Sequence, residues 1–198
     1  MRRSVAVCCV VLTCAIALRA DEPLSQADAA RFQAKLVQIE KNATPPKRGA
    51  AARITTVSDV EVNSYLKFLA GSLVPVGIAD PILHAVGDGR VSGTAVVDLD
   101  AVRTQKKRTW SDPLAYLSGR LPVSAKGTLT TTNGVGRFVL ESAEISGVTI
   151  PKSLMQELLT YYSKSPDRPD GINMDDPFNL PSAIKEIKVG TGTTTIVQ

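Results

Sequence analysis

The sequence predicts an α+β protein in which a curved antiparallel sheet wraps a long helix and a second helix lies near an open edge of the sheet. Three observations predict this class. Apolar residues recur at helical spacing in three segments, they alternate with a period of two in several others, and turn dipeptides separate the alternating segments. Such turns join antiparallel strands, and helices placed before and between hairpins are typical of an α+β arrangement.

The first 20 residues have the layout of a secretory signal peptide, with a basic start at Arg2 and Arg3 and an uncharged apolar run over 5–18. Small residues suit cleavage after Ala17 or, less well, after Ala20. We therefore expect an exported protein, periplasmic or extracellular. A retained anchor is the alternative, although this run is shorter than the roughly 20 residues that usually span a membrane.

The positions of the cysteines and the net charge limit the kinds of function that the mature chain can have. All 3 cysteines lie in the first 20 residues, so no disulfide, thiol nucleophile or cysteine metal site is expected after cleavage. Three of the 23 basic residues also lie there, which leaves 20 against 19 acidic ones. This near-neutral balance argues against nucleic acid as a partner.

Residues 21–53 are expected to form an N-terminal helix and a linker that precede a single α+β domain over 54–198. Ser25 suits a helix cap, and Phe32, Leu36 and Ile39 recur at helical spacing. This stripe is thin, so we expect the helix to lie outside the core. The linker, which ends at Arg53, is rich in proline, alanine and basic residues.

Residues 58–72 form the clearest predicted helix. Ser58 and Glu61 have the spacing of a capping box, and Pro75 ends the segment. Large apolar side chains lie along one face of this helix, namely Val62, Tyr65, Leu66, Leu69 and Leu73.

Alternation then indicates strands over 91–99, 121–131 and 135–148, with hairpin turns at Asp88-Gly89 and Asn133-Gly134. A short helix is expected over 112–117 and a longer one over 151–163. The apolar face of the longer helix consists of Leu154, Met155, Leu158, Leu159 and Tyr162. Two final strands are expected over 184–189 and 193–197.

Few side chains in the chain could carry out chemistry. His84 is the single histidine and has no evident partner, so we expect a structural or surface role. Two Ser-x-x-Lys matches, at Ser64 and Ser182, lack the companion motifs of penicillin-recognising enzymes. The aspartates near Asp175 lack EF-hand spacing. We therefore expect no enzyme activity, no cofactor and no metal site.

Two apolar helix faces remain, and small side chains in the strands could leave space beside them. If that space is unfilled, it is a groove for a hydrophobic ligand; if it is filled, these residues are core. The candidate ligand-binding residues are Tyr65, Leu66, Leu69, Leu73, Leu154, Leu158, Leu159 and Tyr162. The basic run 106–108 beside Trp110 could in addition touch a membrane surface.

The capped helix Val-Ser-Asp-Val-Glu-Val-Asn-Ser-Tyr-Leu, followed by bent strands, resembles small envelope lipid-binding modules of the tubular lipid-binding (TULIP-like) superfamily. The later order of Gly-Val-Thr-Ile-Pro, a helix and the final two strands is also similar. The resemblance covers about residues 57–198. It implies a helix lying in a coiled antiparallel sheet, with lipid in the apolar groove between them.

The sequence therefore predicts an exported, non-enzymatic protein that binds a hydrophobic ligand such as a lipid between helix and curved sheet. The alternative is a structural or assembly factor of the envelope. In that case the core is filled, and the 26–53 segment docks a partner protein.

Overall fold

The computed structural model describes residues 23–44, 51–104 and 118–198. Its helices are α1 (Gln26–Lys41), α2 (Asp59–Phe68), α3 (Leu99–Thr104), α4 (Lys152–Ser163) and the short 3-10 helix η1 (Gly71–Leu73). Its strands are β1 (Ile54–Ser58), β2 (Ile78–Gly87), β3 (Arg90–Asp98), β4 (Arg120–Thr132), β5 (Val135–Ile145), β6 (Val148–Thr149), β7 (Phe178–Asn179), β8 (Glu186–Val189) and β9 (Thr193–Val197). The protein is α+β, as predicted.

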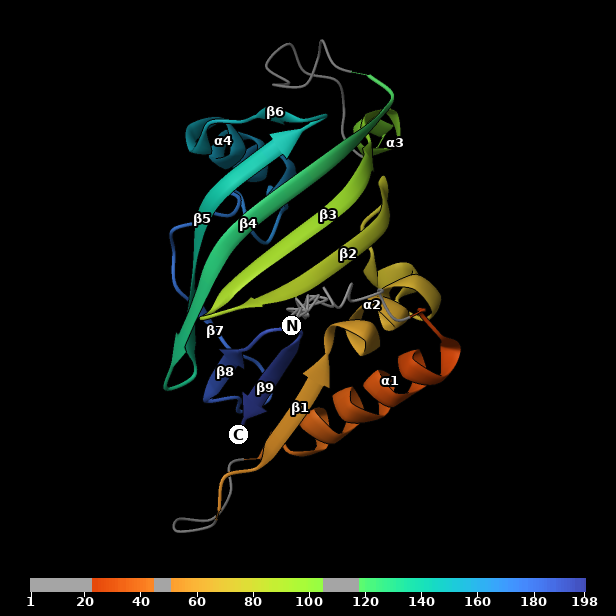
Figure 1. Cartoon of the computed structure of the whole chain (residues 1–198). Helices are drawn as coiled ribbons and strands as arrows, with labels where there is room; N and C mark the ends of the chain where they lie inside the picture. Colours follow the sequence, from red (N-terminus) through yellow and green to blue (C-terminus); the bar gives the residue numbers. More distant parts are fainter. Residues whose placement is uncertain (1–22, 45–50, 105–117) are drawn as a thin grey trace, which may run out of the picture.

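The larger sheet is antiparallel and has the order β2-β3-β4-β5-β6, with β7 also paired to β5 (Figure 1). Two-residue turns at 88–89, 133–134 and 146–147 join its neighbouring strands, and all six turn residues have positive φ. Two positive φ values define the type I′ turn, whose twist matches that of the flanking strands. Because β2 and β6 stand at opposite ends of the strand order, the sheet is open and forms no closed barrel.

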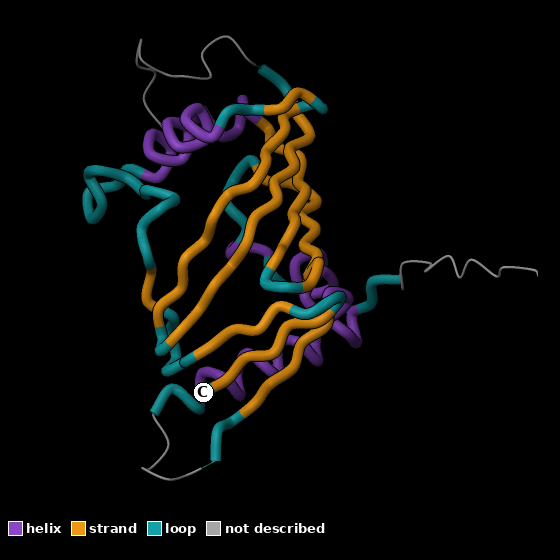
Figure 2. Tube along the Cα trace, turned by 60° about the vertical axis from the view of Figure 1, so that its left-hand side comes forward, coloured by secondary structure: helices purple, strands orange, loops and turns teal. Residues whose placement is uncertain are grey.

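The smaller sheet has the order β1-β9-β8 and lies across one end of the larger one (Figures 1 and 2). The last two strands match the predicted ones, whereas β1 falls in a stretch where no strand was expected. Thr131 of β4 holds the two sheets together, because its hydroxyl group accepts from the Ile187 N–H at 2.7 Å and donates to the Ile187 carbonyl at 3.0 Å.

Helix α2 lies beside the edge strand β2 and is held there by polar side chains. Asn63 donates to the Leu83 carbonyl and accepts from the Leu83 N–H, each at 2.8 Å. The Asp59 carboxylate accepts from the Ala85 N–H at 3.0 Å. These groups take the place of a further strand, since an edge strand presents unpaired backbone groups. The expected wrapping of this helix by the sheet is not confirmed.

The prediction that the N-terminal helix lies outside the core is wrong, because α1 packs along α2. Ala29 and Ile39 are 0% and 6% exposed, and the rings of Phe32 and Tyr65 meet edge to face at 5.3 Å between centroids. Lys35 Nζ lies 2.7 Å from both carboxylate oxygens of Glu61. The thin stripe misled the prediction, because a small alanine permits close helix approach and an ion pair adds to the contact.

Buried apolar side chains gather at two ends of the described structure. Near α1, α2 and the smaller sheet they are Ala29, Ile39, Val57, Ala70, Ala85, Ile184 and Val189. Near α4 they are Leu99, Ala143 and Leu158. Most of them are small or β-branched.

Several expectations fall outside the described residues. These are the signal segment over 1–20, part of the linker, the basic run 106–108 with Trp110, and the helix over 112–117. Among the described helices, none combines the length and the apolar character that a membrane crossing requires.

Candidate functional site

An apolar cavity of about 140 Å³ lies between α4 and the larger sheet. Figure 2 shows α4 over the end of the sheet away from the smaller one. The seven lining residues come from β3, α3, β4, β5 and α4, and all are apolar: Val97, Leu99, Leu121, Val123, Ile145, Met155 and Leu158.

Strand register explains why the floor of this cavity is apolar. Val97 of β3 stands opposite Leu121 of β4, and Val123 of β4 stands opposite Ile145 of β5. Residues directly opposite one another share a face of the sheet. The large aliphatic side chains of three strands therefore form one continuous floor beneath α4.

The next cross-strand row on the same face consists of Leu83, Gly93, Ala125 and Ala143. The residues of β3, β4 and β5 in this row are small, whereas the Leu83 side chain of β2 lies over Gly93, 3.0 Å from the position that a Cβ atom would take there. The expectation that small strand residues leave volume beside a helix stays a prediction.

Helix α4 supplies the roof through its buried face. Leu158 is 8% exposed and Met155, one turn earlier, is half-buried; both line the cavity. Leu159 faces a neighbouring hollow of about 520 Å³, together with Phe138 and the 168–178 loop. Leu154 is exposed, and the Tyr162 ring meets the Tyr161 ring at 5.0 Å between centroids.

The candidate residues of the 58–72 segment do not join those of α4. Tyr65 packs against Phe32 of α1, and Leu66 lines a separate hollow of about 320 Å³. Leu69 and Leu73 follow the end of α2 and are 44% and 71% exposed. The structure thus places the two predicted apolar faces in different surroundings.

Sequence reasoning missed the floor of the cavity. The alternating strands indicated which residues share a face, but not that Val97, Leu121 and Ile145 would meet beneath α4. Met155 belonged to the predicted apolar face of the helix and was left out of the candidate ligand-binding set. Its spacing of three residues from Leu158 was the available signal.

No charged residue is among those that line this cavity. Within the described ranges, the most buried charged group is Glu61, at 7% exposed. Burial acts to raise the pKa of Glu61, but hydrogen bonds from Lys35 and the Ser58 N–H, with the charges of Lys35 and Arg31, outweigh it and lower the pKa. These contacts join α1 to α2, so the low pKa reflects packing of the two helices.

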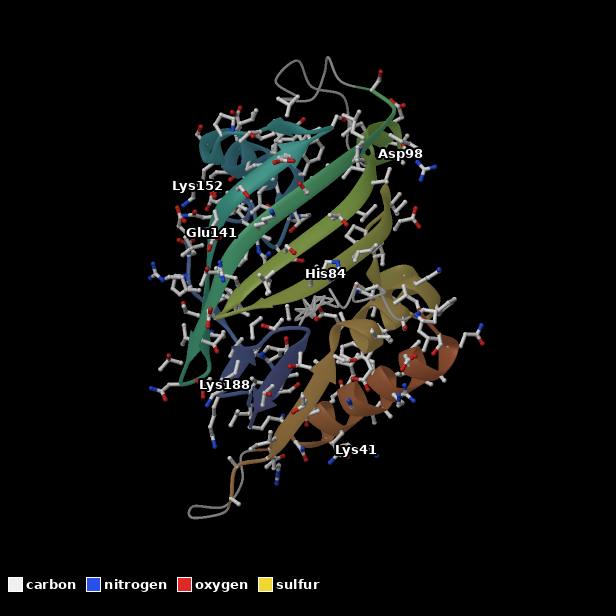
Figure 3. All side chains as sticks on the ribbon, viewed as in Figure 1. Lys41, His84, Asp98, Glu141, Lys152 and Lys188 are labelled. Atoms are coloured by element: carbon white, nitrogen blue, oxygen red, sulfur yellow. The ribbon has the colours of Figure 1, made fainter. Side chains whose placement is uncertain are left out.

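The remaining polar candidates are engaged in local contacts. His84, which Figure 3 labels on β2, is half exposed, and its Nδ1 lies 3.6 Å from an Asp59 oxygen. The Ser64 hydroxyl accepts from the Ser25 N–H, while Lys67 Nζ lies 5.4 Å from the Phe68 ring centroid. Asp175 pairs with Lys152 at 2.5 Å. Across the described ranges, no three His, Cys, Asp or Glu side chains gather as metal ligands would.

Comparison with known proteins adds little to this geometry. No family model matches the chain, and no curated protein matches its sequence. Among solved structures, a crystal structure of lipopolysaccharide binding protein aligns with 78% of this chain at 16% identity and a TM-score of 0.23. The alignment covers 45% of that protein, so this chain corresponds to less than half of its length. At this TM-score the similarity supports no inference about the ligand of this chain.

Proposed function

We propose that this protein is a non-enzymatic binding protein that takes an apolar chain, such as the acyl chain of a lipid, into the cavity beneath α4. One observation carries the proposal: all seven side chains around the cavity are apolar. Water is poorly held in such a space, because it needs polar partners. A hydrocarbon chain loses no hydrogen bonds on entry and gains dispersion contacts.

The size of the cavity limits what it can hold. Cavities of about 150 Å³ lined by aliphatic and aromatic residues accept a ligand as small as benzene, whereas sites for whole drug-sized ligands measure about 300–1,000 Å³. A cavity of about 140 Å³ therefore suits the end of one chain. Each buried methylene contributes about 0.8 kcal/mol, so tight binding requires further contact outside the cavity. The hollow beside Leu159 and Phe138 is the nearest place for it.

The first test is extraction of the purified protein followed by mass spectrometry of the extract. Co-purified acyl lipid supports the proposal.

The second test is titration of the protein with a fluorescent fatty acid, in which the variant Val97→Phe is compared with the variant Val96→Phe. Neighbouring strand residues point to opposite faces, so only the first ring enters the cavity. We expect Val97→Phe to weaken binding at least about tenfold, and Val96→Phe to leave it unchanged, with both variants checked for thermal unfolding. Equal affinity in the two variants would exclude this cavity as the site.

The alternative function required the 26–53 segment to dock a partner protein. Apolar residues of α1 instead contact α2, and the Ile39 carbonyl accepts from the Gln198 side chain at 2.9 Å. This helix is therefore occupied within the chain, which favours the ligand-binding proposal. We propose that this activity lies outside the cytoplasm, which the signal-like layout of the first 20 residues supports.

A further inference from the structure

The connection from α2 to β2 exposes an unusual amount of apolar surface. Six of the fourteen exposed large apolar residues in the described structure lie between residues 68 and 83. Four of them form what we call the 68–76 patch: Phe68, Leu69, Leu73 and Val76, which are 38%, 44%, 71% and 59% exposed. Exposed large apolar residues that cluster in this way are a candidate interaction site.

The patch is held in a defined shape at both ends. At its start, the N–H groups of Leu69 and Ala70 both donate to the Tyr65 carbonyl, and Ala70 is 2% exposed. At its end, the Asp98 N–H donates to the Gly77 carbonyl at 2.7 Å. Gly77 lies so close to Val102 that a Cβ atom there would meet its side chain at 2.5 Å. The backbone is therefore anchored while the large side chains face outward.

We infer that the 68–76 patch docks on a lipid bilayer. Its side chains project from a helix end, a 3-10 turn and a loop, so they form no regular face for a second helix or strand. A few side chains present a few hundred Å² at most, below the roughly 800 Å² that each partner buries in a standard protein complex. A bilayer requires no shape complementarity and accepts apolar side chains at its headgroup boundary.

The segment that carries the patch has a single charged side chain, which is positive. Between residues 62 and 79 that residue is Lys67. The exposed Asp80 follows this segment and lines the hollow at the base of the patch. Lys67 lies beside Phe68, at the edge of the patch. A cation at the rim of an apolar surface is attracted by anionic headgroups.

The patch adjoins other apolar side chains of the fold. Leu24 lines the hollow that Leu66, Val74 and Ile78 form at the base of the patch. Ile78 also stands opposite Val97, which lines the cavity beneath α4. Docking through the patch would therefore bring that cavity near the bilayer, although the inference does not depend on the cavity binding lipid.

The decisive test measures whether residue 73 enters the bilayer. The full chain, with Leu73→Trp or with the control Val135→Trp, is mixed with phosphatidylcholine–phosphatidylglycerol vesicles containing brominated lipid. Val135 is exposed but distant in sequence from the patch. Trp110 is common to both proteins, and the comparison holds whether or not residues 5–18 are retained. We expect bromine quenching several-fold stronger at position 73 than at position 135. Equal quenching would overturn the inference.

A second measurement does not depend on an introduced tryptophan. Vesicle flotation of the Leu73→Ser/Val76→Ser double variant should show at least about tenfold weaker binding than Val135→Ser/Val139→Ser, because each lost apolar contact lowers membrane affinity. Unchanged flotation of the first variant would overturn the inference. Bromine quenching and vesicle flotation do not require fatty-acid binding in the cavity, so the failure of the proposed function and the failure of this inference can be told apart.

Discussion

Helices α2 and α4 have similar apolar stripes in the sequence, yet they are used in opposite ways. The buried residues of α2 are Glu61, Asn63 and Ser64, which are all polar. The buried residue of α4 is Leu158. The difference follows from where each helix meets the larger sheet. Helix α2 meets the backbone of an edge strand, which needs hydrogen-bond partners, whereas α4 meets the apolar face of the strands.

This comparison teaches that an apolar stripe does not by itself say which side of a helix faces the fold. On α2 the stripe is divided: Tyr65 meets α1, and Leu69 and Leu73 reach solvent. On α4 the stripe meets the sheet through Met155 and Leu158. A candidate site built from both stripes therefore splits into a cavity at one helix and an exposed patch at the other.

The largest expected effect is that of removing the polar contact between α2 and β2. Asn63→Leu leaves the Leu83 N–H and carbonyl without the partners that the Asn63 side chain, itself 5% exposed, gives them, and each group left unsatisfied beneath the helix costs about 1–3 kcal/mol. We expect the free energy of unfolding to fall by about 4 kcal/mol in chemical denaturation. Lys67→Leu, an exposed change on the same helix, should stay within about 0.5 kcal/mol. Similar values for the two variants would show that the polar face of α2 does not hold the sheet edge.

A somewhat smaller effect is expected on α4. Leu158→Ala enlarges the cavity, and leucine-to-alanine changes at buried sites cost about 2–5 kcal/mol. We expect about 3 kcal/mol from thermal or chemical unfolding, against less than about 1 kcal/mol for Leu154→Ala on the exposed side. If Leu154→Ala costs as much as Leu158→Ala, α4 does not bury the face described here.

The smallest effect concerns Glu61 and the packing of α1 on α2, and it depends on pH. Because the folded state lowers the pKa of Glu61 below its ordinary value of 4.5, the ionised carboxylate stabilises the fold. This contribution is fully present above pH 4.5 and is lost as the pH falls through the lower folded-state value. Near pH 7, Glu61→Gln should cost about 1–2 kcal/mol, since hydrogen bonds to charged groups contribute about 1.5–3 kcal/mol.

Unfolding measured from pH 7 down to pH 3 checks this expectation. The difference between Glu61→Gln and the unmodified protein should shrink only in the acidic part of that range. The exposed change Glu157→Gln on α4 serves as the control and should show no such trend. A constant difference at all pH values would mean that the Lys35–Glu61 contact does not depend on the carboxylate charge.

Much of the secondary structure could be predicted because its causes are local. The Asn133-Gly134 turn follows from residues that tolerate positive φ, and the capping box of Ser58 and Glu61 forms as its spacing predicts. Strand β1 was missed even though Ile54 to Val57 is rich in β-branched residues, because its partner β9 lies at the other end of the chain. The packing of α1 was missed for the same reason, since Lys35 and Phe32 have their partners on α2.

The sequence by itself determined the α+β class, the turns at 88–89 and 133–134, the starts of α1, α2 and α4, and the scarcity of reactive side chains, because each depends on nearby residues or on composition. The turn at 146–147 and helix α3 were not predicted. Tertiary structure alone decided that Asn63 faces a strand edge, that Val97, Leu121 and Ile145 meet beneath α4, and that Leu73 stays exposed. These outcomes depend on which distant segments come into contact. A periodic pattern records that a side chain is apolar, but the partner that covers it, or the lack of one, is set by the arrangement of the whole chain.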